Sequence, residues 1–207
     1  ARYMQNLNIG TIVTYNPPQP DAQGKFPHEP YSYQDASWNN IVVESLDYVI
    51  EYSLSHSTEI SKSDSPTVYL AGLSAGGAAC GAVAPFYPEV SRILMISAYD
   101  SVGDYFYEGI RRFAGDIYMA YGSDDPTAAF LAYSMRFIAR EATSLYSQEI
   151  PNCNHGFTGA TISKILSNAF TWAFAGDQRF PSSEASVRAA GADNLLDRAI
   201  ICESLDE

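Results

Sequence analysis

The five residues Gly72-Leu73-Ser74-Ala75-Gly76 combine a hydroxyl group with two glycines at a fixed spacing. Residues 66–71 before them predict a short buried strand, and the small apolar residues 77–84 after them predict a helix packed closely on a sheet. A serine on a sharp turn between strand and helix is typical of a nucleophile, because its oxygen stays exposed while the glycines avoid steric clashes. The alternative is a turn that is glycine-rich for packing only, with a serine that takes no part in chemistry.

A nucleophilic serine needs an adjacent base, and that base needs a third group to orient it. The chain contains three histidines, His28, His56 and His155. His155 lies in a loop after the predicted strand at residues 145–150, where a base could approach the serine. His28 lies in a proline-rich polar loop and His56 near a helix end, so we expect both at the surface. We therefore expect His155 to be the base, with a solvated loop histidine as the alternative.

The third group is predicted to be Asp125, which follows the apolar strand at residues 117–121. A competing interpretation is that an aspartate before Pro126 simply caps the helix that begins near residue 127. Asp124 and Asp100 are rival acids, because Asp124 belongs to the same acidic pair and Asp100 follows the preceding strand at residues 93–98.

The order Ser74, Asp125, His155, each after a strand, resembles the α/β-hydrolase fold family over residues 9–175. The family's Gly-x-x-Asp pattern after its penultimate strand matches Gly122 to Asp125. The resemblance implies an α/β fold with a mainly parallel sheet of about five strands flanked by helices. These five would be the family's fourth to eighth strands, at residues 8–16, 67–71, 92–98, 117–121 and 145–150.

The chain departs from the family because nothing precedes residue 8 that could form the first three strands, so the resemblance implies a core truncated at its N-terminus. The backbone N–H of Ala75 is one of the two oxyanion-hole donors that the family uses, and the loop after the missing third strand would supply the other. The sheet edge beside the serine would then be open to pairing. The chain is a fragment of a longer hydrolase, or another polypeptide supplies the missing strands, or the fold is trimmed and inactive.

The charge and apolar content of the chain exclude some classes of binding partner. A formal net charge of −12 over 207 residues argues against nucleic acid and anionic membranes as partners. No apolar run approaches the length of a membrane span. We expect residues 1–176 to form one hydrolase-like domain and residues 177–207 an acidic helical tail. We also expect a soluble protein, in the cell interior or an organelle lumen rather than secreted, without assigning its compartment.

Helices are predicted at residues 37–54, 127–143 and 158–175 from the spacing of their apolar residues. The segment between the strands at residues 92–98 and 117–121 is too short for a large lid domain. Its four aromatic residues could line an apolar acyl pocket or pack on the sheet: Tyr99, Tyr105, Phe106 and Tyr107.

Cys80, Cys153 and Cys202 show no spacing typical of zinc ligands or of a disulfide framework. Cys80 is expected to be a buried apolar residue, and Cys153 is of interest because it lies two residues before His155. No metal site, phosphate-binding loop or cofactor motif is predicted.

Two hypotheses follow. The first is a serine hydrolase that cleaves a carboxylic ester or thioester of a small-molecule acyl substrate through an acyl-enzyme, with Ser74 as nucleophile, His155 as base and Asp125 as orienting acid. The second is a catalytically inactive hydrolase-fold subunit with a structural or binding role in a larger assembly. A protein partner would then bind at the open sheet edge or through the C-terminal tail.

Overall fold

The computed structural model describes residues 67–158 and 160–181, together with positions 42, 43, 46–48, 50, 51 and 55. Within this part of the chain one sheet is formed by β1 (Val68–Leu73), β2 (Val90–Ile96), β3 (Asp116–Gly122) and β4 (Ser144–Ile150). The strands pair in the order β1-β2-β3-β4, and every pair is parallel. The predicted α/β class with a mainly parallel sheet is therefore confirmed. The strand predicted at residues 8–16 lies outside the described residues.

The register of the sheet follows from its apolar strand residues. Ile93 of β2 pairs with Leu70 of β1 and with Ile117 of β3. Residues 93–96 are fully buried, as expected for a strand that is covered on both faces. Because all four strands run in one direction, their carboxyl ends lie along the same edge of the sheet. The loops that carry the predicted site residues begin at this edge.

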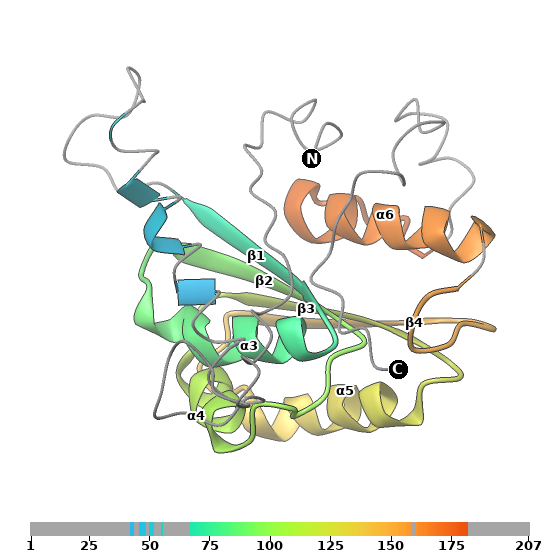
Figure 1. Cartoon of the computed structure of the whole chain (residues 1–207), viewed down its shortest axis with the longest axis horizontal. Helices are drawn as coiled ribbons and strands as arrows, with labels where there is room; N and C mark the ends of the chain where they lie inside the picture. Colours follow the sequence, from blue (N-terminus) through green and yellow to red (C-terminus); the bar gives the residue numbers. More distant parts are fainter. Residues whose placement is uncertain are drawn as a thin grey trace, which may run out of the picture.

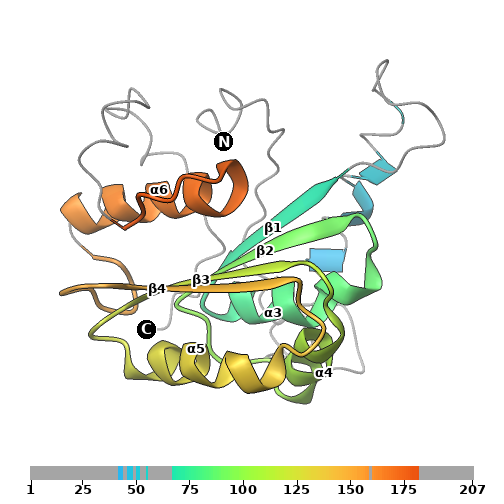
Figure 2. The same cartoon turned by 180° about the vertical axis from the view of Figure 1, so that it is seen from behind.

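Helices cover both faces of the sheet (Figures 1 and 2). One face carries α3 (Ala75–Val83), α4 (Asp104–Arg112) and α5 (Pro126–Ile138), and the other face carries α6 (Ala160–Ala175). A short 3₁₀ turn, η1 (Ala84–Phe86), continues α3. The buried apolar side chains form one cluster on each side of the sheet. The helices predicted at residues 127–143 and 158–175 are thus present, and α5 ends at Ile138.

Helix α4 was not predicted. Gly103, with a φ of 60°, turns the chain into the helix, Asp104 lies in its first turn and Arg111 and Arg112 lie in its last turn. These charges complement the partial charges of the helix ends. Phe106 and Ile110 bury one side of the helix against α3, where a side chain at Gly81 would meet both.

Aromatic contacts and one arginine hold α6 on its face of the sheet. The rings of Trp172 and Tyr118 meet edge to face with centroids 4.8 Å apart, and Phe174 stacks on Tyr69 at 5.1 Å. Arg92 donates a hydrogen bond of 3.2 Å from Nη1 to the carbonyl oxygen of Ala173 in the last helical turn. The loop that precedes α6 is therefore attached to a helix that is itself fixed on the sheet.

The described positions between 42 and 55 are helical, and Val42 and Leu46 join the cluster on the α3 side. The other residues of the helix predicted at 37–54 lie outside the described residues, as does the chain after residue 181. Among the described residues, no helix is long and apolar enough to span a membrane.

Candidate active site

Ser74 occupies a single strained position between strand and helix. β1 ends at Leu73 and α3 begins at Ala75, so the direction of the chain reverses at this one residue. Ser74 has a φ of 53° and a ψ of −121°, a backbone conformation that is unfavourable for a residue with a side chain. Its backbone N–H donates a hydrogen bond of 2.8 Å to the carbonyl oxygen of Ile96, which fixes the turn against β2.

Gly72 is required because β1 and α3 approach each other closely. A Cβ atom at this position would collide with the backbone carbonyl of Gly76 in the first turn of α3. Backbone atoms cannot move aside as the end of a flexible side chain can. The glycine two residues before Ser74 therefore has a steric cause, as the sequence indicated.

His155 lies in the loop between β4 and α6, which is the loop predicted from the sequence. The loop passes close to the end of β3, since a Cβ atom at Gly122 would collide with the carbonyl group of Cys153. A glycine at residue 122 thus allows the histidine loop to approach the acidic loop. This contact gives a physical reason for the Gly-x-x-Asp pattern from Gly122 to Asp125.

Asp125 makes the contacts that both interpretations of the sequence require. Its Oδ1 accepts a hydrogen bond of 3.2 Å from the backbone N–H of Ala128, as the N-cap of α5, and Pro126 occupies the first turn. Its Oδ2 lies 2.7 Å from Nδ1 of His155. The capping bond therefore holds the carboxylate in place while its second oxygen contacts the imidazole.

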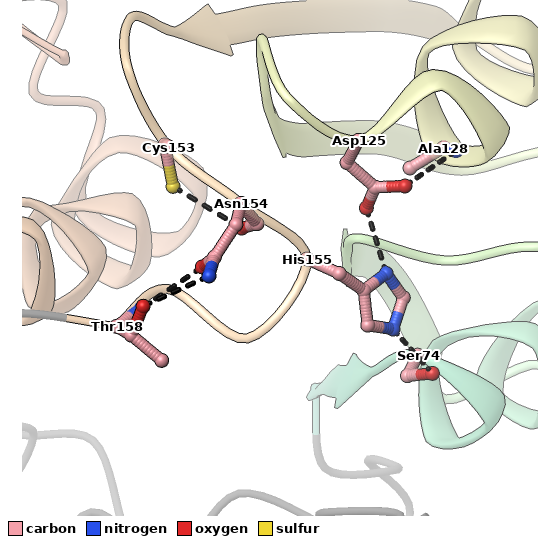
Figure 3. A network of polar contacts seen from close by, with 7 residues as sticks. All are labelled: Ser74, Asp125, Ala128, Cys153, Asn154, His155 and Thr158. Carbon is pink, nitrogen blue, oxygen red and sulfur yellow. Dashed lines mark hydrogen bonds and ion pairs between the residues drawn. The ribbon is translucent and has the colours of Figure 1, made fainter.

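A continuous chain of hydrogen bonds joins the three residues (Figure 3). Nε2 of His155 lies 3.0 Å from Oγ of Ser74, and Nδ1 lies 2.7 Å from Asp125. An ionised carboxylate can only accept, so Nδ1 donates to Asp125 and Nε2 is left to accept from the Ser74 hydroxyl. Ser74 and Asp125 are 2% and 4% exposed, whereas 45% of the His155 side chain is exposed. A buried serine and carboxylate are thus joined through an imidazole that reaches the surface.

The rival acids have other partners. Asp100 accepts a hydrogen bond of 2.7 Å at Oδ2 from the Tyr107 hydroxyl. Asp124 is exposed and accepts at Oδ1 from the Ser123 hydroxyl at 3.2 Å. Among the described residues, only Asp125 places a carboxylate within hydrogen-bond distance of His155. His28 and His56 lie outside the described residues.

The four aromatic pocket candidates separate into different environments. The Tyr99 ring lies beside His155, with centroids 6.1 Å apart and planes tilted by 57°. Phe106 is completely buried in the cluster between the sheet and α3, which corresponds to the packing alternative rather than to a pocket wall. Tyr105 is 52% exposed on α4, and Tyr107 is bonded to Asp100. Of the four, Tyr99 is the one whose ring lies beside His155.

Cys153 is an inert neighbour of this site. It is 1% exposed, and its Sγ lies 3.4 Å from the carbonyl oxygen of Asn154. Burial, together with the nearby carboxylates of Asp124 and Asp125, raises the pKa of the thiol to about 11. The thiol is therefore protonated at neutral pH and is a poor nucleophile.

The sequence did not identify the polar side chains that connect the loops around His155, namely Ser123, Asn154 and Thr158. Asn, Ser and Thr commonly bond to nearby backbone groups, but this tendency is too general to predict specific partners. No group of three or more histidine, cysteine, aspartate or glutamate residues in the described part of the chain could hold a metal ion.

No protein-family model and no curated protein sequence matches the chain. Its structure is similar to that of a proposed dienelactone hydrolase from Klebsiella pneumoniae subsp. pneumoniae, with a TM-score of 0.54, 15% identity, and coverage of 68% of this chain and 62% of that one. A proposed α/β hydrolase of unknown function from Agrobacterium tumefaciens gives a TM-score of 0.53 and 14% identity, covering 82% of this chain and 67% of that one. An uncharacterised protein from Bacillus cereus gives 0.54 and 12%, covering 85% and 54%.

The chain has the α/β-hydrolase fold, as these structures and the parallel sheet with helices on both faces establish. It spans less than two thirds of the length of the Klebsiella protein. Identities of 12–15% establish the fold, and the reaction has to be argued from the residues of the site.

Proposed function

We propose that the protein is a serine hydrolase that cleaves a carboxylic ester or thioester of a small-molecule acyl substrate through an acyl-enzyme. The observation that carries this proposal is the chain of hydrogen bonds from Ser74 through His155 to Asp125, with distances of 3.0 and 2.7 Å. A hydroxyl, an imidazole and a buried carboxylate in this order form the arrangement that activates serine for attack on carbonyl carbon.

In the first half of the reaction, Oγ of Ser74 attacks the substrate carbonyl carbon while Nε2 of His155 takes the hydroxyl proton. The carbonyl electron pair moves to oxygen and forms a tetrahedral oxyanion. Asp125 stabilises the imidazolium through Nδ1. The backbone N–H of Ala75 is assigned as one oxyanion donor, because it is the first amide of α3 and the first four amides of a helix have no partner within it.

When the tetrahedral intermediate collapses, the bond to the leaving alcohol or thiol breaks and His155 donates its proton to that group. Water then attacks the acyl-enzyme, and His155 takes a proton from the water. The second tetrahedral intermediate expels Oγ of Ser74, which regains the proton from His155. The products are a carboxylic acid and an alcohol or thiol, and the enzyme returns to its starting state.

The geometry favours an enzyme over an inactive subunit. A structural subunit has no need for a strained serine, and a left-handed backbone at a residue other than glycine costs on the order of 1–3 kcal/mol. The capping bond to Ala128 would also persist without His155, so helix stability alone does not account for the second contact of Asp125. Tyr99 is assigned to the wall of the substrate site because its ring lies beside the imidazole.

The test is a pre-steady-state assay with p-nitrophenyl acetate, followed by a panel that contains an acyl thioester and a lactone. The lactone is included because the Klebsiella protein is a proposed dienelactone hydrolase. We expect a burst of one equivalent of p-nitrophenol and its loss in Ser74→Ala. Ser134→Ala is a matched control, because Ser134 bonds to Phe130 about two and a half turns along α5 from Asp125. The absence of both burst and turnover with every member of the panel would contradict the proposal.

A further inference from the structure

The loop that carries His155 has a strained backbone. Asn152 has a φ of 53° and Phe157 a φ of 51°, so two residues with side chains adopt the left-handed conformation on either side of the histidine. Such residues persist only where surrounding contacts impose the conformation. The position of the His155 ring therefore depends on the bonds that hold this loop.

The first half of the loop is bonded to the acidic loop. The N–H of Ser123 donates to the carbonyl oxygen of Ile150 at 2.9 Å, and the N–H of Asn152 donates to Oγ of Ser123 at 2.9 Å. The N–H of Asp124 donates to the carbonyl oxygen of Cys153 at 2.8 Å. These bonds end at Cys153, two residues before His155.

The second half of the loop is closed by Asn154 and Thr158 (Figure 3). Oδ1 of Asn154 accepts from the backbone N–H of Thr158 at 3.1 Å, and Nδ2 of Asn154 donates to Oγ1 of Thr158 at 2.9 Å. The N–H of Phe157 donates to the carbonyl oxygen of Asn154 at 3.2 Å, and the Phe157 side chain is buried. The residues on both sides of His155 are thus tied to each other.

We infer that the Asn154–Thr158 pair is a clasp that positions His155 for proton transfer with Ser74. This inference rests on the proposed function. Both side chains point away from Ser74 and toward each other, so they are positioning residues and not catalytic residues (Figure 3). The clasp spans one short turn with His155 inside it, so its loss lets the backbone of His155 relax.

The clasp affects kcat more than KM. A displacement of about 1 Å in a catalytic group can lower the rate about a hundredfold, because proton transfer depends steeply on geometry. Asn154 and Thr158 bond to each other and lie away from Ser74, so we expect KM to be largely independent of the clasp (Figure 3). A contribution to folding stability alone would instead lower the amount of active enzyme and leave kcat per active site unchanged.

The experiment compares Asn154→Ala, Thr158→Val and Thr158→Ser with the unaltered chain, each normalised to active sites by burst titration. We expect kcat to fall about tenfold to a hundredfold in Asn154→Ala and less in Thr158→Val, with KM within about threefold. Thr158→Val keeps the bond from its backbone N–H to Asn154 and loses only the bond to the hydroxyl. Thr158→Ser keeps both bonds, so we expect its kcat to equal that of the unaltered chain. Thr143→Val is the control, because it removes a hydroxyl bonded to the carbonyl oxygen of Ala114 at 2.7 Å, near the starts of β3 and β4.

A second measurement does not require activity. The proton NMR signal of His155 Nδ1–H, assigned by its loss in His155→Gln, reports on the bond to Asp125. We expect faster exchange with water in Asn154→Ala than in the unaltered chain. If the chain hydrolyses esters and Asn154→Ala keeps kcat within about twofold, the inference that the clasp positions His155 is wrong. If the chain hydrolyses nothing, the proposed function fails, and an unchanged exchange rate in Asn154→Ala overturns the clasp separately.

Discussion

Asp125 shows how one side chain can satisfy two sequence patterns that appear to compete. An aspartate before proline at the start of a helix predicts a cap, and an aspartate after a strand in a hydrolase-like order predicts an acid. The two oxygens of the carboxylate divide these roles between Ala128 and His155. The cap therefore contributes to the site, because it sets the direction of the oxygen that contacts the imidazole.

The two roles can be separated by substitution. Asparagine caps helices about as well as aspartate, so we expect Asp125→Asn to change the free energy of unfolding by less than about 0.5 kcal/mol. It removes the negative charge opposite His155, and we expect kcat to fall about 10⁴-fold. Asp125→Ala should lose kcat and also about 1 kcal/mol of stability through the cap. Urea unfolding and ester hydrolysis measure the two effects, and equal loss of stability in both variants would contradict the division of roles.

The Cys153 thiol offers a second residue-scale prediction. Its burial and raised pKa of about 11 predict that iodoacetamide does not alkylate it in the folded chain at about pH 8. In urea the thiol becomes exposed and should react. Peptide mass spectrometry locates the adduct, with the buried Cys80 as an internal comparison. Rapid alkylation of Cys153 in the folded state would show that the β4–α6 loop opens.

At the scale of elements, the strand–turn–helix unit around Ser74 depends on the absence of a side chain at Gly72. Gly72→Ala places a methyl group against the carbonyl of Gly76, where only backbone atoms could move. We expect a loss of more than about 2 kcal/mol in the free energy of unfolding, measured in urea. Gly156→Ala is the matched control, because its added methyl group would meet only Cγ2 of Thr158 at 3.6 Å. Similar stability of the two variants would contradict the steric argument.

The sequence predicted β1, β2 and β3 because much of each strand is an apolar run, whereas β4, SLYSQEI, is more polar and buries only Ile150. β2, predicted at residues 92–98, spans Val90–Ile96, and β4, predicted at residues 145–150, spans Ser144–Ile150. Helix α4 was missed because its sequence, DYFYEGIRR, contains a glycine and three aromatic residues that are poor helix formers. Packing of Phe106 and Ile110 against α3 stabilises this helix, and a local pattern does not report such a contact.

The site was partly predictable for a related reason. Ser74, Asp125 and His155 follow strands whose ends meet at one edge of the sheet, so their order along the chain carries information about their positions. The bonds of Asn154 and Thr158 depend on the exact path of one loop. Loop geometry of this kind has no periodic signal in the sequence.

At the scale of the whole molecule, two tyrosines that bond to aspartates make the free energy of unfolding depend on pH. The Tyr107 hydroxyl donates to Asp100, and this bond with burial raises its pKa from 10 to about 12. Burial and a hydrogen bond of 2.8 Å to Asp47 raise the pKa of Tyr87 to about 12. Between about pH 10 and pH 12 these tyrosines keep their protons in the folded chain and lose them in the unfolded chain. The free energy of unfolding therefore falls as pH rises through this range.

We therefore expect both contributions to be complete below about pH 10 and to disappear as pH rises to about 12. Urea unfolding over this range measures the slope of stability against pH. The double variant Tyr87→Phe with Tyr107→Phe should have a shallower slope than the unaltered chain. The same slope in both would mean that these tyrosines ionise equally easily in the folded and unfolded states.

We propose above all that the fold activates Ser74 as a nucleophile. A fluorophosphonate probe followed by intact-mass spectrometry tests it most directly, because the probe reacts with activated serines and needs no knowledge of the natural substrate. We predict one adduct on the unaltered chain, none on Ser74→Ala, and one on Ser134→Ala. Absence of an adduct on the folded, unaltered chain, or an adduct that persists in Ser74→Ala, would contradict the account.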